Sequence, residues 1–185
     1  MKALTDYIHS KGLRAGIYTS PGPWTCTKYM GSYEHEQVDA QQYAKWGFDF
    51  LKYDSCSYDY IKERTRYDYI RPYALMGEIL KNLDRDMVYN LCQYGMDNVW
   101  EWGARVEAQS WRTMGDVGLL SSFMEVGIRN CQYADYAGPG HWNDPDYILI
   151  GFVGDARTGG EGAPVKLSYN QQYQYMSMWS LMASP

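Results

Sequence analysis

Apolar positions along the chain follow two different periods. Short apolar runs fit buried strands over residues 13–18, 48–53, 87–92 and 108–113. Amphipathic segments fit helices near residues 4–8 and over 35–46, 69–83, 99–106, 119–129 and 171–182. Residues 142–150 begin polar, as in a loop, and end apolar. Strands and helices therefore alternate at intervals of roughly 20 to 40 residues, which is the length of a βα unit.

This alternation predicts a parallel sheet, and both a doubly wound sheet and a (β/α)8 TIM barrel fit it. The predicted strands end near Tyr18, Asp54, Cys92, Thr113 and Asp146. This makes about five strands, whereas a closed barrel has eight. No linker or second domain is visible, so we expect residues 1–185 to form one incomplete domain, a fragment of a larger fold.

Composition and charge narrow the function classes. Hydrophobic residues make up 45% of the 185, so the chain is expected to fold. Its net charge is −5 and Lys and Arg are scattered, which argues against a nucleic-acid partner. No run of 18 apolar residues occurs, and the amphipathic start is not a signal peptide. Its 19 Tyr and 7 Trp residues suit a sugar ligand, although they also suit an ordinary core.

Cysteine and histidine residues form no recognisable metal-binding motif. The three His residues are well separated, and no two of Cys26, Cys56, Cys92 and Cys131 stand in a CxxC arrangement. We therefore expect no metal site. Four cysteines allow a disulfide, but their spacing alone does not establish one.

Ionisable side chains follow the predicted strands at several points. Asp54 ends the segment Leu51–Asp54, Asp116 closes the segment Trp111–Asp116, and Asp146 closes the segment His141–Asp146. Glycoside hydrolysis uses two carboxyl groups that flank the scissile bond, and carboxylates from separate βα units can converge in that way. An Asp after a strand is also a common helix N-cap, so position alone leaves both interpretations open.

The order of the motifs gives a more specific indication. The chain carries Gly16-Ile17-Tyr18, Thr25-Cys26, Trp46-Gly47, Leu51-Lys52-Tyr53-Asp54 with Cys56, Trp111-Arg112 with Asp116, and Trp142-Asn143-Asp144-Pro145-Asp146. In this order they resemble glycoside hydrolase family 27, the melibiase-like α-galactosidases and α-N-acetylgalactosaminidases of clan D. The resemblance implies a (β/α)8 barrel, here without its first two strands and closing strand. It also implies that the chain lacks an acidic pair that precedes this region in the family.

The resemblance implies roles for named residues. Asp54 matches the nucleophile and Asp116 the general acid/base. Substrate-binding positions match Tyr18, Lys52, Gln93, Arg112, Trp142 and Asp146, and Cys26 and Cys56 match a disulfide pair. The family uses no cofactor. Lys52 and Asp54 share one face of a strand, and retention of configuration requires carboxyl groups about 5–5.5 Å apart. Because an Arg that pointed at Asp116 would favour its ionised form, we expect Arg112 to bind sugar oxygens instead.

The loop from Asn90 to Met96 departs from animal members of the family. By the resemblance this loop senses the substituent on the sugar's second carbon, and bulky Gln93 and Met96 favour galactose over N-acetylgalactosamine. Cys92 lacks the partner that animal members provide, so Cys92 and Cys131 are expected to be free, buried thiols.

The expected function is therefore a retaining hydrolase of terminal α-D-galactosyl residues, working by double displacement. Close alternatives are hydrolysis of α-N-acetylgalactosaminides or β-L-arabinopyranosides. A different class is a carbohydrate-binding remnant without catalysis, and a further alternative is a gene-model fragment without independent function. A Cys26–Cys56 disulfide would imply an oxidising compartment, hence a secreted or periplasmic protein. The sequence does not predict an oligomeric state.

Overall fold

The computed structural model describes residues 1–61, 65–117, 122–155 and 160–184. Five parallel strands form its central sheet. They are β1 (Gly16–Thr19), β2 (Phe50–Asp54), β3 (Val88–Cys92), β4 (Ser110–Arg112) and β5 (Trp142–Asp144). Their spatial order is the same as their order along the chain, and every neighbouring pair is parallel.

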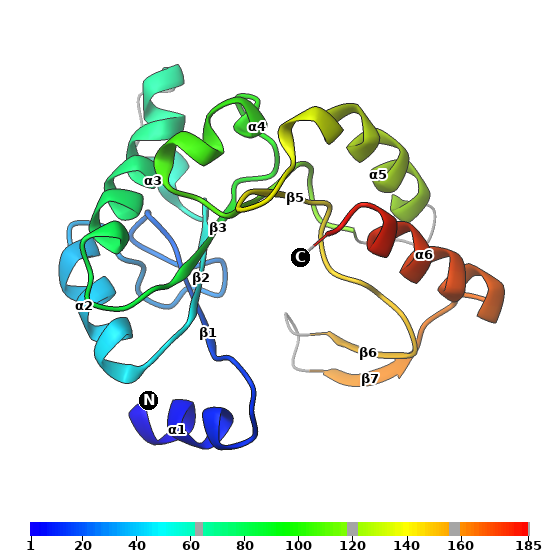
Figure 1. Ribbon diagram of the computed structural model, residues 1–185, viewed down its shortest axis with the longest axis horizontal. Helices are drawn as coiled ribbons and strands as arrows, with labels where there is room; N and C mark the ends of the chain where they lie inside the picture. The colour runs from blue at the N-terminus through cyan, green and yellow to red at the C-terminus, as the bar shows by residue number, and fades with distance from the viewer. Residues whose placement is uncertain (62–64, 118–121, 156–159, 185) are drawn as a thin grey trace.

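Helices follow the strands and lie outside them. The α-helices are α1 (Lys2–Ser10), α2 (Glu36–Trp46), α3 (Arg66–Lys81), α4 (Val99–Trp102), α5 (Ser122–Asn130) and α6 (Tyr169–Leu181). Short 3₁₀ turns occur at Tyr58–Tyr60, Gly103–Val106 and Cys131–Tyr136. Helices α2 to α5 form an arc around the strands (Figure 1). Among the described residues no helix has the length and apolar character needed to cross a bilayer.

This topology decides between the two folds that the alternation allowed. A doubly wound sheet reverses its strand order, whereas strands in sequential order with helices on the outer side are the arrangement of a (β/α)8 barrel. The chain therefore forms part of such a barrel, as the resemblance implied.

The main core lies between the sheet and its outer helices. The strand side chains that point toward the helices are fully buried, among them Leu51, Tyr53, Leu91 and Trp111. Because side chains alternate along a strand, Lys52 and Asp54 point to the opposite face, which is the interior of the barrel. The strand that builds the core thus also presents the polar site.

Local signals explain most helix boundaries. Gly47 ends α2 in the left-handed conformation, with φ of 88°, as its position predicted. Helix α3 begins earlier than predicted, because Thr65, directly before Arg66, forms a capping box with Asp68 in the first turn. Pro72 therefore lies inside α3, beyond the first turn of the helix.

The pattern did not predict the β-hairpin near the end of the chain, and it indicated a loop where β5 lies. Strands β6 (Phe152–Asp155) and β7 (Gly160–Pro164) pair in antiparallel orientation. The second strand has the sequence Gly-Glu-Gly-Ala-Pro, which has no apolar alternation and three residues that disfavour strands. Near the hairpin a second core joins α5 to α6, where the rings of Phe123 and Tyr175 stack with centroids 4.5 Å apart.

Asp49 ties three segments together at the amino-terminal end of the sheet. Its buried carboxylate accepts hydrogen bonds from the Ala15 N–H at 2.9 Å and from Arg85 Nη2 at 2.7 Å, and it contacts His9 Nε2 at 2.7 Å. Arg85 also donates to the carbonyl oxygens of Phe48 and Gly47. Burial alone would raise the pKa of Asp49, but these hydrogen bonds and charges outweigh it and hold the pKa well below its usual range.

Replacing Asp49 with Asn should therefore destabilise the fold. We expect the free energy of unfolding to fall by about 1 to 3 kcal/mol, because the partly buried guanidinium of Arg85 loses its charged partner. Since the folded-state pKa is lowered, the contribution is fully present above the unfolded-state pKa of about 3.9 and is lost as the pH falls below it. Urea unfolding at pH 7 and at pH 3 measures both effects.

The exposed acid Asp6 supplies the matched control. Its ion pair with Lys2 lies on the exposed surface of α1, so Asp6→Asn should change the unfolding free energy by less than about 1 kcal/mol. Equal effects of Asp6→Asn and Asp49→Asn at pH 7 would contradict a stabilising role for Asp49.

Candidate active site

The carboxyl ends of the five parallel strands meet at one edge of the sheet. Register pairs Asp54 at the end of β2 with Cys92 at the end of β3, and Arg112 at the end of β4 with Asp144 at the end of β5. In a (β/α)8 barrel this edge carries the active site, because the βα loops begin there. The candidate residues predicted from the sequence converge on it.

Asp54 is held by two phenolic hydroxyl groups. Tyr18 Oη donates to Oδ2 at 3.0 Å and Tyr94 Oη donates to Oδ1 at 2.7 Å, while Asp54 itself is 6% exposed. Burial and the charge of Asp54 raise the pKa of both Tyr18 and Tyr94 well above the ordinary value, so both phenols remain protonated donors. The carboxylate is thus fixed with one donor on each oxygen.

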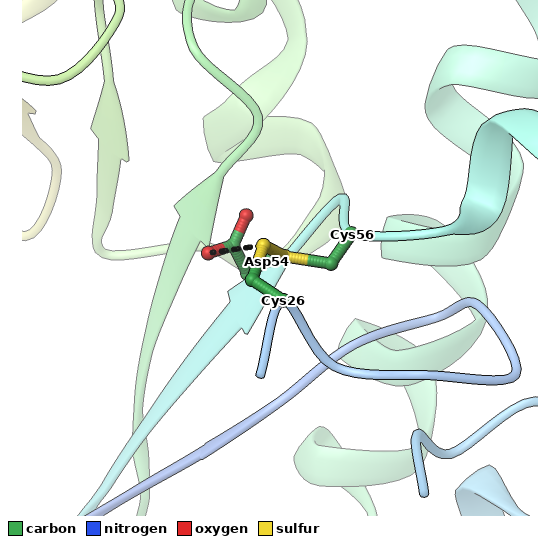
Figure 2. A group of neighbouring side chains, drawn as sticks. All are labelled: Cys26, Asp54 and Cys56. Atoms are coloured by element: carbon green, nitrogen blue, oxygen red, sulfur yellow. Dashed lines mark hydrogen bonds between the residues drawn. A yellow bond between two sulfur atoms is a disulfide. The ribbon is translucent and has the colours of Figure 1, made fainter. Parts of the chain in front are cut away.

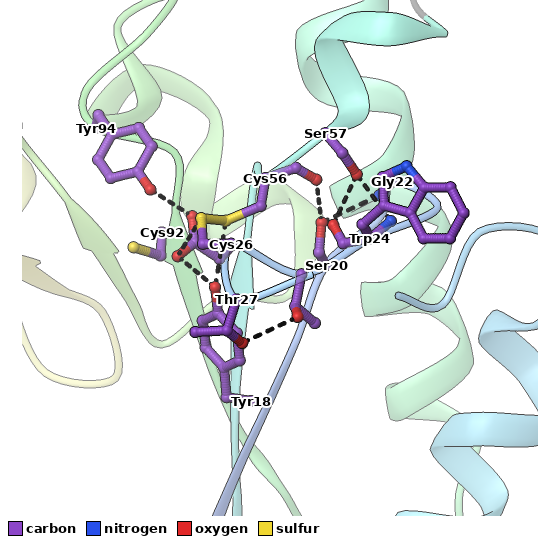
Figure 3. Close-up of a disulfide and its surroundings, with 12 residues drawn as sticks. Tyr18, Ser20, Gly22, Trp24, Cys26, Thr27, Cys56, Ser57, Cys92 and Tyr94 are labelled. Carbon is purple, nitrogen blue, oxygen red and sulfur yellow. Dashed lines mark hydrogen bonds between the residues drawn. A yellow bond between two sulfur atoms is a disulfide. The ribbon is translucent and has the colours of Figure 1, made fainter. Parts of the chain in front are cut away.

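A disulfide lies directly against this carboxylate. Cys26 in the loop after β1 is bonded to Cys56 just after β2, with Cα atoms 5.1 Å apart, which confirms the predicted pair. Figure 2 shows the Cys26 sulfur beside Asp54, 4.0 Å from Oδ2. Tyr18 Oη also lies 3.2 Å from Cys56 Sγ, and Figure 3 shows this ring beside the disulfide. The Tyr18 hydroxyl therefore contacts both the disulfide and the Asp54 carboxylate.

Arg112 joins two other carboxylates at the end of β4. Its guanidinium lies 3.0 Å from Asp146 Oδ1 and 3.2 Å from Asp116 Oδ1. Burial alone would lower the pKa of Arg112, but the surrounding carboxylates, Asp146 first, raise it. The expectation that Arg112 would not point at Asp116 is therefore wrong. The side chain is 1% exposed because three oxygen acceptors, the Cys92 sulfur and the Tyr94 ring surround it.

The loop after β5 explains how Asp146 reaches this guanidinium. Asp144 Oδ1 accepts the Asp146 N–H at 2.8 Å, which turns the backbone, and Asp146 itself adopts a φ of 94°. The second oxygen of Asp146 accepts the Val117 N–H at 2.7 Å. Asp146 is therefore buried and engaged on both oxygens.

Lys52 lies two residues before Asp54 on β2, and Trp142 occupies the same position as Lys52 in the register of the sheet. The register runs from Tyr18 through Lys52, Asn90 and Ser110 to Trp142. Lys52 is half-buried on the same face as Asp54, as predicted from its spacing. Trp142 shares this row at the far edge of the sheet and is also half-buried, but the register does not bring it next to Asp54.

Gln93 occupies the loop that follows β3. Its Nε2 donates to the carbonyl oxygen of Met96 at 2.8 Å, and the residue is 1% exposed. Among the residues that the structure describes, no donor lies within hydrogen-bond distance of its Oε1. A buried acceptor without a donor is costly, so Gln93 offers one unused acceptor close to the site.

Tyr94 is the functional candidate that the sequence reasoning missed. The sequence indicated the loop from Asn90 to Met96 but not Tyr94 within it. Sequence spacing does not give the side-chain direction of a loop residue in the left-handed conformation. With a φ of 63°, Tyr94 turns its hydroxyl to Asp54 and its ring to the Arg112 guanidinium, 5.7 Å from the ring centroid. Gly95 permits this turn, since a Cβ there would lie 2.1 Å from the Thr113 carbonyl oxygen.

The two cysteines outside the disulfide differ from each other. Both are free, as predicted, and Cys92 is buried beside Arg112, with Sγ 3.7 Å from Nη1. Burial and the charge of Asp54 raise the pKa of the Cys92 thiol to about 12, so it is protonated at neutral pH. Cys131 is exposed, which corrects the prediction that it is buried.

The arrangement provides two separately held carboxylates at one edge. Asp54 is a buried carboxylate fixed by hydroxyl donors, whereas Asp116 has a side chain that is 36% exposed and pairs with Arg112. Two carboxyl groups in unlike surroundings are what acid-assisted displacement at a sugar carbon requires. Among the described residues, potential metal ligands cluster at Cys26, Asp54 and Cys56, but the disulfide occupies both sulfurs.

Comparison with known proteins identifies the family to which the chain belongs. A family model described as alpha galactosidase A matches residues 1–185. The chain is 37% identical over its whole length to alpha-galactosidase A of Cellvibrio japonicus and 39% identical to alpha-galactosidase 3 of Arabidopsis thaliana, covering 44% and 38% of those proteins. It thus spans about two fifths of their length.

A solved structure gives the same result. The chain superposes over its whole length on the crystal structure of alpha-galactosidase I from Mortierella vinacea, with a TM-score of 0.83, 30% sequence identity and 48% of that chain covered. On the match of the family model over all 185 residues, the chain belongs to glycoside hydrolase family 27, the α-galactosidase family.

Proposed function

We propose that this chain carries the catalytic carboxylates of a retaining α-galactosidase that acts on terminal α-D-galactosyl residues. The observation that carries the proposal is Asp54, placed at the end of β2 with Tyr18 and Tyr94 donating to its two oxygens. Family membership supports the substrate class, since the relatives that it matches are named α-galactosidases.

The proposed reaction has two displacements. In the first, Asp54 attacks the anomeric carbon while the bond to the leaving oxygen breaks, and Asp116 gives a proton to that oxygen. This step requires Asp116 to move away from Arg112 and take up a proton when the substrate binds. In the second, water attacks the glycosyl ester, Asp116 takes a proton from the water, and the Asp54 carboxylate leaves. Two inversions return the original configuration, and Asp116 ends protonated, as it was before the first displacement.

The geometry supports different tasks for the surrounding residues. Because both oxygens of Asp146 are engaged and it is 2% exposed, we assign it the task of holding Arg112 in place. Arg112 in turn holds Asp116 over the end of β4 until substrate binds. Sugar hydroxyls would then be bound by Lys52 and Tyr18 on the interior face, and Trp142 would lie at the edge of the same row.

The loop after β3 supports galactose as the bound sugar. Gln93 is fixed by its hydrogen bond to the Met96 carbonyl and leaves an acceptor unused, which could take a hydrogen bond from a hydroxyl on the second sugar carbon. A larger N-acetyl group would have to displace this side chain. The disulfide next to the site also favours an oxidising compartment, so we propose a secreted or periplasmic protein.

Replacing Asp54 with Ala tests the proposed nucleophile. We expect hydrolysis of p-nitrophenyl α-D-galactopyranoside by the chain to fall by at least about 10³-fold, because no other described carboxylate takes the same position. The exposed acid Asp84 is the control, and Asp84→Ala should hydrolyse at the parent rate. Equal rates for Asp54→Ala and the parent would refute the assignment.

The same assay separates the alternatives. A parent that folds and binds galactose without turnover would support the carbohydrate-binding remnant. Faster hydrolysis of an α-N-acetylgalactosaminide or a β-L-arabinopyranoside, measured side by side, would move the substrate to those classes.

Tyr94→Phe tests whether the second phenol serves the reaction. Loss of one hydrogen bond to a charged group should lower kcat by about 10-fold and leave KM nearly unchanged, because Tyr94 holds the reacting carboxylate. Tyr29→Phe is the control, since Tyr29 is 76% exposed. A change confined to KM, or no change at all, would show that Tyr94 does not position Asp54.

A further inference from the structure

Three potential metal ligands meet at the disulfide. The sulfurs of Cys26 and Cys56 and a carboxylate oxygen of Asp54 all lie within 4.8 Å of one another. Figure 2 shows them as one compact group, with Asp54 Oδ2 facing the Cys26 sulfur. In the oxidised protein the two sulfurs bond to each other, so only the carboxylate has ligand character.

We propose that reduction of the Cys26–Cys56 disulfide creates a binding site for a thiophilic divalent cation such as Zn²⁺, with Cys26, Cys56 and Asp54 as its protein ligands. Bonds of about 2.3 Å to sulfur and about 2.1 Å to oxygen place the ligand atoms of a tetrahedral zinc ion roughly 3.6 to 3.8 Å apart. The 4.0 Å between Asp54 Oδ2 and Cys26 Sγ is close to that span.

The backbone already holds the ligands at the needed separation. The Cα atoms of the two cysteines are 5.1 Å apart, so two thiolates can share one ion without a large movement of either loop. Ser20 and Ser57 fix these loops to each other, because Ser20 Oγ donates to the Cys56 carbonyl and Ser57 Oγ hydrogen-bonds to the backbone of Trp24 (Figure 3). These contacts do not depend on the disulfide.

The surroundings orient the carboxylate for such an ion. Tyr94 donates to Oδ1, which leaves Oδ2 on the side of the sulfurs. A hydrogen bond from outside the ligand set fixes a carboxylate and strengthens metal binding. Tyr18 Oη lies 3.0 Å from Oδ2 and 3.2 Å from Cys56 Sγ, so its hydroxyl contacts two of the three proposed ligand atoms.

The reduction step is chemically simple. A trialkylphosphine attacks the exposed Cys26 sulfur, and with one water the products are the phosphine oxide and two thiols. Binding of the divalent cation then releases the two thiol protons. The bound ion would occupy Oδ2 of Asp54. If Asp54 is the nucleophile, as proposed above, Zn²⁺ should therefore abolish hydrolysis by the reduced protein. Metal binding itself does not depend on that assignment.

Cobalt titration tests the metal site without any need for turnover. The chain is reduced with tris(2-carboxyethyl)phosphine, freed of reagent without air, and titrated with Co²⁺. We expect one Co²⁺ per chain and a thiolate-to-cobalt absorption band that added Zn²⁺ removes. The oxidised chain should show no such band.

Matched variants locate the ligands. Cys26→Ser should abolish two-thiolate binding, and Asp54→Asn should keep the band but weaken Co²⁺ binding by about 10-fold or more. Cys92→Ser and Cys131→Ser should bind as the reduced parent does, because both thiols lie outside the group. Unchanged affinity in Asp54→Asn, or loss of the band in Cys92→Ser, would overturn the assignment.

Folding of the reduced chain is read by circular dichroism in the same samples. An ion that binds the folded protein must stabilise it, so Zn²⁺ should raise the thermal midpoint of the reduced parent and not that of Cys26→Ser. A reduced chain that is unfolded and that Zn²⁺ does not refold would also overturn the proposal.

Discussion

Parallel pairing of β1 to β5 in sequential order is the constraint on which the site depends. Tyr18, Asp54, Cys92 and Arg112 come from four strands separated by long stretches of chain, and only a common strand direction brings them to one edge. The same alternation that buries Leu51 and Tyr53 against the helices turns Lys52 and Asp54 inward. Core and site are therefore two faces of the same strands.

The edge is finished by loops that fix side chains through hydrogen bonds. Tyr94 and Asp146 both adopt positive φ values, and each thereby turns toward a charged partner, Asp54 in one case and Arg112 in the other. Backbone strain of this kind persists where surrounding contacts determine it, and it is common at functional sites. Here the positive φ of Tyr94 places a hydroxyl donor on Asp54, and the positive φ of Asp146 places its carboxylate against Arg112, which also pairs with Asp116.

The sequence predicted those features that depend on the spacing of apolar residues and on local helix-ending signals. Strands β1 to β4, most of the outer helices and the end of α2 at Gly47 follow from apolar spacing and one glycine. Strand β5 lies over Trp142–Asp144, where the polar pattern indicated a loop. The Cys26–Cys56 pair was implied by family resemblance and not by spacing. The hairpin of β6 and β7 has no apolar alternation, and the directions of Tyr94 and Arg112 depend on loop dihedral angles and on partners distant in sequence. Such features are decided by tertiary contacts, which a one-dimensional pattern does not contain.

The central claim is that Asp54 forms the covalent bond to the sugar. The probe is an α-galactosyl fluoride with a second fluorine on the sugar ring. The nucleophile displaces the anomeric fluoride and forms a glycosyl ester, which water then hydrolyses slowly, so the intermediate accumulates. Mass spectrometry of the digested chain should then find one added galactosyl group on Asp54 and none after Asp54→Ala. A label on Asp116 or another residue, or a fully folded chain that turns over the fluoride without any ester on Asp54, would contradict the account.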